Sequence, residues 1–160
     1  MFKMFKKKEK SIYAVATGQL IELANVSDAM FSQKMMGDGF AVLPTDGNVS
    51  SPIDGKVMSV FPTKHAITLE TNDGLDCLIH MGVDTVELNG EPFTIHVQEG
   101  DNVSSETLLA TIDLDKLKSA SKHIDIIVVF PNYAEKIKLM EMDTLKQVVS
   151  TNQIGKLILK

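Results

Sequence analysis

The chain has 160 residues, of which 16 are basic and 21 acidic, so that its formal net charge is −5. This length suits one domain with a sizeable core, and a single cysteine excludes an internal disulfide framework and fits a reducing compartment. No apolar run approaches the roughly 20 residues of a membrane-spanning helix, and the first ten residues lack the apolar stretch of a signal peptide. We therefore expect a cytoplasmic protein.

The charge is unevenly distributed along the chain. Residues 1–10 hold five lysines and one acid, whereas residues 22–115 hold 16 acids and only three lysines. Every basic residue is a lysine, so no guanidinium group is available to clamp a phosphate. The acidic body argues against nucleic acid as a partner, because that affinity comes mainly from cationic contacts, and it favours a positively charged partner.

In chain order, the sequence is a series of short β-rich runs separated by Asp-Gly, Asn-Asp-Gly and Asn-Gly turns. The predicted strands are residues 12–16, 19–23, 56–61, 65–71, 75–81, 93–97, 108–114, 124–130, 137–141 and 156–159. Helical periodicity is confined to short stretches at residues 28–36, 113–118 and 144–149. This pattern predicts an all-β, antiparallel β-sandwich with a few short helical turns.

The expected domain organisation is a flexible basic tail, residues 1–10, followed by a single domain, residues 11–160. Residues 51–57 and 97–103 each place an acid-Gly turn before a β run, which favours a barrel-sandwich hybrid with a duplicated motif. In the tail, Phe2 and Phe5 accompany clustered lysines and could make weak contact with anionic lipid. Disorder in solution is the simpler interpretation, because ten residues form little helix alone.

Two histidines face each other in the predicted hairpin of residues 61–85. If Asn72-Asp73 is a two-residue loop, His65 lies directly opposite His80, and if the loop is Asp73-Gly74, the two are diagonal neighbours. Both registers keep the imidazoles on one face, whereas a three-residue loop places them on opposite faces. Two neutral imidazoles at contact range can share phosphoryl transfer, one as nucleophile and one as hydrogen-bond donor. A pair of purely structural histidines is the alternative.

The stretch Gly74-Leu75-Asp76-Cys77-Leu78-Ile79-His80-Met81-Gly82-Val83-Asp84-Thr85-Val86 resembles the signature of the glucose-type enzyme IIA (EIIA) of the bacterial phosphoenolpyruvate:sugar phosphotransferase system. The similarity runs from about residue 13 to the C-terminus and includes Thr63-Lys64-His65-Ala66. It departs from the family at Cys77, where an aliphatic residue is usual, and at Glu106, where a turn glycine is common.

The resemblance implies an antiparallel β-sandwich and a phosphotransferase component. His80 would accept the phosphoryl group on Nε2, His65 would stabilise that group, and Thr63 would orient His65. The phosphocarrier protein HPr would be the donor and the EIIB domain of a sugar permease the acceptor. The implied partner surface has an apolar rim with flanking acids: Asp28, Ala29, Met30, Phe31, Met36, Phe61, Leu78, Asp84 and Val86. We expect a monomer that requires no cofactor.

Two rival interpretations remain. A regulatory module of the same fold would bind partners without accepting phosphate, although the presence of His65, His80 and Thr63 argues against it. A zinc-dependent hydrolase would need more than two histidines, because catalytic zinc usually takes three protein ligands. Zinc at His65 and His80, completed by a partner in a regulatory complex, is the remaining metal hypothesis. The sequence does not identify the sugar.

Overall fold

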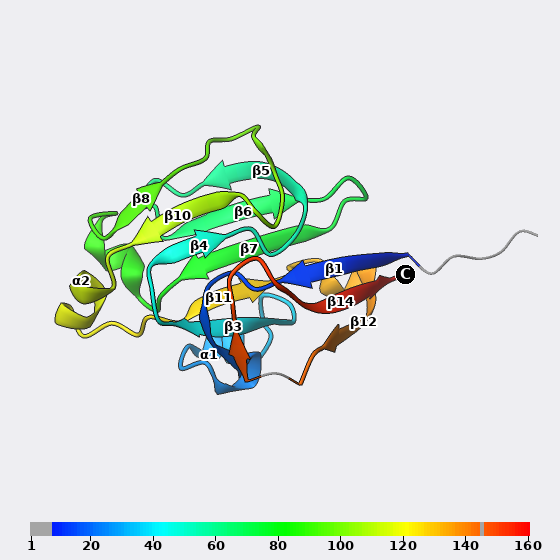
Figure 1. Ribbon diagram of the computed structural model, residues 1–160, viewed down its shortest axis with the longest axis horizontal. Helices are drawn as coiled ribbons and strands as arrows, with labels where there is room; N and C mark the ends of the chain where they lie inside the picture. The colour runs from blue at the N-terminus through cyan, green and yellow to red at the C-terminus, as the bar shows by residue number, and fades with distance from the viewer. Residues whose placement is uncertain (1–7, 145) are drawn as a thin grey trace, which may run out of the picture.

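The computed structural model describes residues 8–144 and 146–160, and it folds into antiparallel sheets linked by short helices (Figure 1). The largest sheet has the strand order β13-β2-β3-β11-β7-β6-β5-β9. Two three-stranded sheets, β1-β14-β12 and β4-β10-β8, complete the architecture. The predicted antiparallel β-sandwich class is confirmed.

The strands of the large sheet are β2 (Gly18–Glu22), β3 (Gly39–Pro44), β5 (Gly55–Val60), β6 (Ala66–Glu70), β7 (Asp76–Met81), β9 (Asn102–Val103), β11 (Ile126–Val129) and β13 (Gln147–Val148). The smaller sheets contain β1 (Glu9–Tyr13), β4 (Asn48–Ser50), β8 (Phe93–Ile95), β10 (Leu108–Ile112), β12 (Ile137–Met142) and β14 (Gln153–Leu159). The short helices are η1 (Leu23–Asn25), α1 (Ala29–Ser32), η2 (Thr85–Leu88), α2 (Leu114–Ser119) and α3 (Tyr133–Lys136).

Each of the ten predicted strands overlaps a strand of the structure, but β3, β4, β9 and β13 were not predicted. Strand β3 is buried on both faces, so its sequence has no alternation of apolar and polar residues. The helix predicted at residues 144–149 is wrong, because Gln147–Val148 pair with Gln19 and Gly18 as β13. The helix predicted at residues 113–118 is confirmed as α2. Asp113 caps it by accepting a hydrogen bond from the Lys116 amide.

The helix predicted over residues 28–36 is shorter in the structure. Only Ala29–Ser32 form α1, and the segment that follows is a set of turns in which Lys34 has a φ of 59° and Gly37 a φ of 92°. Asp28 begins the helix by accepting a hydrogen bond from the Met30 amide at 2.9 Å. The segment is therefore one short helix followed by turns, and it lies beside the large sheet.

The boundary predicted for the tail needs correction. Strand β1 begins at Glu9, which pairs with Ile158 of β14, and the Lys8 carbonyl accepts a hydrogen bond from the Leu159 amide. Figure 1 shows β1 and β14 side by side near the C-terminus. The rest of the tail, with its predicted membrane contact, lies outside the described residues. Among residues that are described, no helix is long and apolar enough to cross a membrane.

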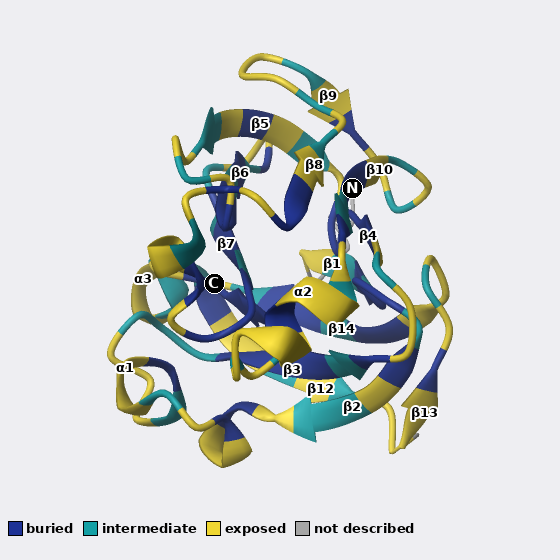
Figure 2. Ribbon diagram, turned by 90° about the vertical axis from the view of Figure 1, so that its left-hand side faces the viewer, coloured by how far each residue is buried: buried dark blue, intermediate teal, exposed yellow. Residues whose placement is uncertain are grey.

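The two segments of the predicted repeat meet in the large sheet, where Gly55 of β5 pairs with Val103 of β9. The sheet as a whole has two apolar sides. One side carries the main core, which includes Ile67, Ile79 and Met81, and the dark blue segments in Figure 2 show how much of each central strand is buried. On the other side, η1 and α1 cover a smaller cluster: Leu23, Val26, Phe31, Ala41, Ala66, Leu78, Val83, Ile127 and Val129.

Candidate functional site

The hairpin of β6 and β7 has neither of the two predicted registers. Ala66 lies opposite His80 and Glu70 opposite Asp76, and three residues, 72–74, form the loop. Gly74, with a φ of 83°, supplies the left-handed conformation, and its amide donates to the Thr71 carbonyl at 3.0 Å. A turn followed by a left-handed residue is a common three-residue hairpin loop. In a regular strand this register would place His65 and His80 on opposite faces.

The two imidazoles nevertheless lie against each other. Their ring centroids are 5.0 Å apart, with the rings at 76°. His80 is within β7, whereas His65 precedes β6 in a bend that follows Lys64, whose φ is 59°. The predicted proximity is therefore present, although the reason given for it, a one-face strand register, is wrong.

The environment of His80 fixes which of its nitrogens is free. Its Nδ1 lies 2.7 Å from the Gly82 carbonyl oxygen, which can only accept, so Nδ1 carries the hydrogen. A neutral ring then has an unprotonated Nε2 with a free electron pair. Gly82 has a φ of 79°, and a Cβ there would lie 2.5 Å from Thr85 Cγ2, so the loop that holds this carbonyl requires glycine.

His65 is held by a hydroxyl group. Thr63 Oγ1 lies 2.6 Å from His65 Nδ1, and when the hydroxyl donates this hydrogen bond, the neutral ring carries its hydrogen on Nε2. Phe61 lies edge-on to the His65 ring, with the two ring centroids 5.3 Å apart. The ring centroids of Phe31 and His80 are 5.0 Å apart. His65 is buried and His80 half-buried, so aromatic rings and neighbouring strands restrict both imidazoles.

Burial lowers the pKa of both histidines below the ordinary value of 6.5. For His80, burial is the largest influence on the pKa, the hydrogen bond to Gly82 acts in the opposite direction, and the neighbouring His65 lowers it further. The charges of Asp28 and Asp84 raise the His80 pKa. The net direction favours two neutral imidazoles near neutral pH, one with an electron pair on Nε2 and one able to donate a hydrogen bond.

The predicted partner surface divides into exposed and buried members. Met30, Phe61 and Val86 are among the exposed large hydrophobic side chains, and Ala29 is exposed as well. Phe31 and Leu78 are buried in the smaller cluster, so they are not exposed members of the predicted rim. Met36 packs partly against the same cluster. Met35, which is 68% exposed, is an additional apolar side chain that the resemblance did not assign.

The acids assigned to this surface lie at helix starts. Asp28 caps α1, and Asp84 precedes η2 with a φ of 59°. Asp84 is exposed and Asp28 half-buried. The residues assigned to the predicted site are thus a histidine pair, exposed apolar side chains and two carboxylates.

The described residues, 8–144 and 146–160, contain no group of three or more His, Cys, Asp or Glu side chains placed to hold a metal ion. The histidine pair therefore falls short of the three protein ligands typical of catalytic zinc. Cys77 is buried in the main core on the opposite face of β7 from His80, and burial raises the pKa of its thiol.

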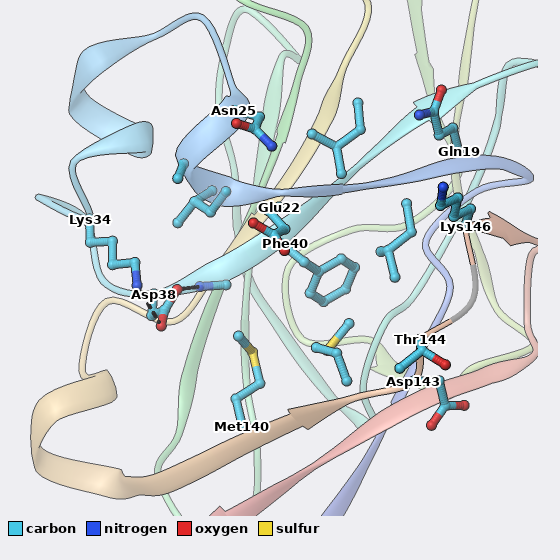
Figure 3. A pocket seen from close by; sticks show the side chains of 16 residues that line it. Gln19, Glu22, Asn25, Lys34, Asp38, Phe40, Met140, Asp143, Thr144 and Lys146 are labelled. Atoms are coloured by element: carbon cyan, nitrogen blue, oxygen red, sulfur yellow. Dashed lines mark hydrogen bonds and ion pairs between the residues drawn. The ribbon is translucent and has the colours of Figure 1, made fainter.

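A separate groove lies between β2, β3 and the end of β12 (Figure 3). Its labelled side chains include Glu22, Phe40, Met140 and Asp143, and the Lys34–Asp38 ion pair lies at one end. It has no histidine among its lining residues. The groove is therefore distinct from the histidine site.

Comparison with known proteins gives a consistent result. The model of the family described as "phosphoenolpyruvate-dependent sugar phosphotransferase system, EIIA 1" matches residues 10–136. The glucose-specific EIICBA component of the phosphotransferase system of Streptococcus pneumoniae is 45% identical over 152 residues, which are 95% of this chain and 21% of that relative. The chain thus spans about a fifth of the length of this relative.

A solved structure, the glucose permease IIA from Mycoplasma capricolum, superimposes with a TM-score of 0.87 at 32% sequence identity. The match covers 96% of this chain and 99% of that one. Almost the whole chain is therefore similar in sequence to the Streptococcus protein and in fold to the Mycoplasma protein.

Proposed function

This chain belongs to the EIIA 1 family of the phosphoenolpyruvate-dependent sugar phosphotransferase system, whose members are phosphoryl carriers in sugar uptake, and we propose that His80 is the residue that carries the phosphoryl group. The observation on which this rests is the hydrogen bond between His80 Nδ1 and the Gly82 carbonyl, 2.7 Å long. Because it occupies Nδ1, it directs the free electron pair to Nε2.

The proposed step is a displacement at phosphorus. The Nε2 electron pair forms the new nitrogen–phosphorus bond while the bond between phosphorus and the donor breaks, and its electron pair leaves with the donor. Transfer to the acceptor reverses these roles. Little proton transfer is needed, so catalysis depends on alignment of the two proteins and on stabilisation of the phosphoryl oxygens.

His65 would provide that stabilisation. With Thr63 donating to Nδ1, the Nε2 hydrogen of His65 is available to a phosphoryl oxygen on the neighbouring ring. The low pKa that burial gives His65 keeps this ring neutral, so it acts as a hydrogen-bond donor and not as a cation. Thr63 orients the ring and does not itself touch the phosphoryl group.

We infer that HPr supplies the phosphoryl group and that the EIIB domain of a sugar permease receives it. Both would dock on the rim formed by Met30, Phe61 and Val86, with Asp28 and Asp84 facing basic side chains of the partner. The relatives named above are glucose-specific, which makes glucose the first sugar to examine. We assign the transfer to the cytoplasm and to a monomeric domain.

The reaction itself needs no cofactor, because the phosphoryl group is carried covalently on an imidazole. Zinc at His65 and His80 would need at least one further ligand from a partner. Such a zinc ion would belong to a regulatory complex and not to the phosphoryl transfer. A purely regulatory module is the second candidate, and it predicts no phosphorylation at all.

The experiment is incubation with phosphoenolpyruvate, enzyme I and HPr, followed by mass measurement of the intact protein. Wild type should gain the mass of one phosphoryl group, and His80→Ala should gain none. His96→Ala is the matched control, because His96 is exposed and bonded to Thr111 in another sheet, and it should label like wild type. No label on wild type, or equal labelling of His80→Ala, would refute the proposal.

A further inference from the structure

The direction of the His65 side chain is unusual for a residue at this place in the hairpin. Its carbonyl accepts a hydrogen bond from the Met81 amide at 2.8 Å, so the ladder of β6 and β7 extends to His65 and Met81. Opposed residues of an antiparallel pair point to the same face, and Met81 is fully buried in the main core. Regular strand geometry would therefore direct His65 into the main core and away from His80.

The turn between β5 and β6 changes this direction. The Lys64 amide donates to the Phe61 carbonyl at 2.7 Å, and the Phe61 amide donates to the Ala66 carbonyl at 3.0 Å. Pro62 and Thr63 are thus the central residues of a tight turn, and Lys64 follows it with a φ of 59°. A left-handed residue interrupts the alternation of a strand, so the residue after it, His65, can turn toward the other face.

A second segment supports the turn from the side. Gly90, with a φ of 80°, lies against it so closely that a Cβ would be 3.3 Å from both the Thr63 carbonyl oxygen and Lys64 Cδ. The aliphatic stem of Lys64 thus lies over the end of η2, while Lys64 remains exposed. The turn is therefore fixed by packing as well as by its own two hydrogen bonds.

We propose that Lys64 is a positioning residue for phosphoryl transfer and that it acts through its left-handed backbone, not through its charge. This conformation places the His65 ring against His80 and within 2.6 Å of Thr63 Oγ1. The proposal rests on the function proposed above for the histidine pair. Lysine has no special affinity for the left-handed region, which glycine and asparagine occupy most readily.

Three substitutions at position 64 separate backbone from charge. Lys64→Gly and Lys64→Asn remove the ammonium group but retain the left-handed conformation, whereas Lys64→Val removes both, because a β-branched residue is strongly disfavoured there. Lys64→Gly and Lys64→Asn should transfer phosphate to EIIB within about twofold of wild type. Lys64→Val should be slower by roughly tenfold to a hundredfold, the loss that an ångström-scale displacement of a catalytic group causes.

The second measurement is a spectroscopic one that needs no phosphate. Nitrogen-15 chemical shifts of the His65 ring report which nitrogen is protonated, and they should be those of wild type in the glycine and asparagine variants and altered in Lys64→Val. Ser121→Val is the matched control, because Ser121 has the same φ of 59° in the turn after α2. It should lose stability and leave the His65 signal and the transfer rate unchanged.

The outcomes distinguish this proposal from the proposed function. If wild type accepts no phosphate, the function fails, but the His65 signals still test the role of Lys64. If Lys64→Gly and Lys64→Asn are as slow as Lys64→Val, or Lys64→Val matches wild type in both measurements, the proposal is overturned. Should Lys64→Val not fold, Lys64→Ala replaces it, with an effect between those of glycine and valine, and equality with glycine would contradict the proposal.

Discussion

The two faces of β7 (Asp76–Met81) differ in how they are covered, although alternate residues of one strand form them. Cys77, Ile79 and Met81 point into the main core, where each is at most 1% exposed. Leu78 and His80 point to the other face, where only a small cluster under η1 and α1 covers the sheet. One face of the strand therefore provides stability, and the other supports the proposed chemistry.

This difference has a physical origin in the amount of cover. On the main-core face a polar ring would have no access to solvent or to a partner, and burial there raises the pKa of the Cys77 thiol, so the thiol is kept inert. On the opposite face the cover is incomplete, so His80 stays half-buried: dry enough for its pKa to fall and open enough for a partner to reach it. We expect this partial burial to be what permits the proposed phosphoryl transfer at His80.

The largest expected effect comes from the main-core face. Ile79→Ala should lower the free energy of unfolding by roughly 2–5 kcal/mol, because it leaves a cavity among fully buried side chains. Phosphoryl acceptance by the folded fraction should be unchanged. Chemical denaturation combined with the labelling assay measures both quantities.

Leu78→Ala is the matched change on the other face of the same strand. It should cost about 2 kcal/mol or less, because its cluster is small and 6% of Leu78 is already exposed. It should also slow transfer, because Leu78 is buried in the cluster beneath the proposed docking surface. Equal stability losses with no difference in transfer would remove the distinction between the faces.

The next prediction concerns the rate of transfer and is made at His65. His65→Gln should still accept phosphate on His80 but pass it to EIIB roughly a hundredfold more slowly, the usual consequence of losing one donor to a developing charge. Single-turnover transfer measured separately for the two half-reactions tests this. Transfer to EIIB at the wild-type rate in this variant would show that His65 is not the donor to the phosphoryl oxygens.

The smallest effect is on the pH dependence of stability. Both histidines have a pKa lowered by burial, so the unfolded chain binds protons more readily below pH 6.5 than the folded protein does. Their contribution to stability is complete above about pH 6.5 and is lost as the pH falls through the lowered folded-state values. Thermal unfolding between pH 7 and pH 5 should therefore show a shallower decline when both histidines are replaced by glutamine. A steeper decline in that variant would contradict the assigned direction.

Much of the molecule follows from the sequence because period-two patterns and Asp-Gly or Asn-Gly turns are local signals. They predict β7 and most other strands to within a few residues. Strand β3 was missed because burial on both faces removes the alternation. Strand β13 was missed because its pairing with β2 links residues far apart in the chain, which local propensity does not detect.

The histidine pair shows where sequence reasoning reaches its limit. Strand alternation and turn signals placed His65 near His80, but the loop has three residues instead of two, so the register is shifted by one position. The proximity is restored by the turn at Lys64, a left-handed lysine that no residue preference indicates. Two features of the backbone that the sequence did not predict, the three-residue loop and the left-handed Lys64, therefore offset each other.

The central claim is that phosphate is carried on Nε2 of His80. The most direct test is nitrogen-15 and phosphorus-31 NMR of the protein phosphorylated by phosphoenolpyruvate, enzyme I and HPr, with the ring signals assigned by comparison with His65→Gln. The account predicts a single phosphorus signal coupled to Nε2 of His80, while Nδ1 keeps its hydrogen and its bond to the Gly82 carbonyl. A phosphoryl group on Nδ1 of His80, or on His65, would contradict it.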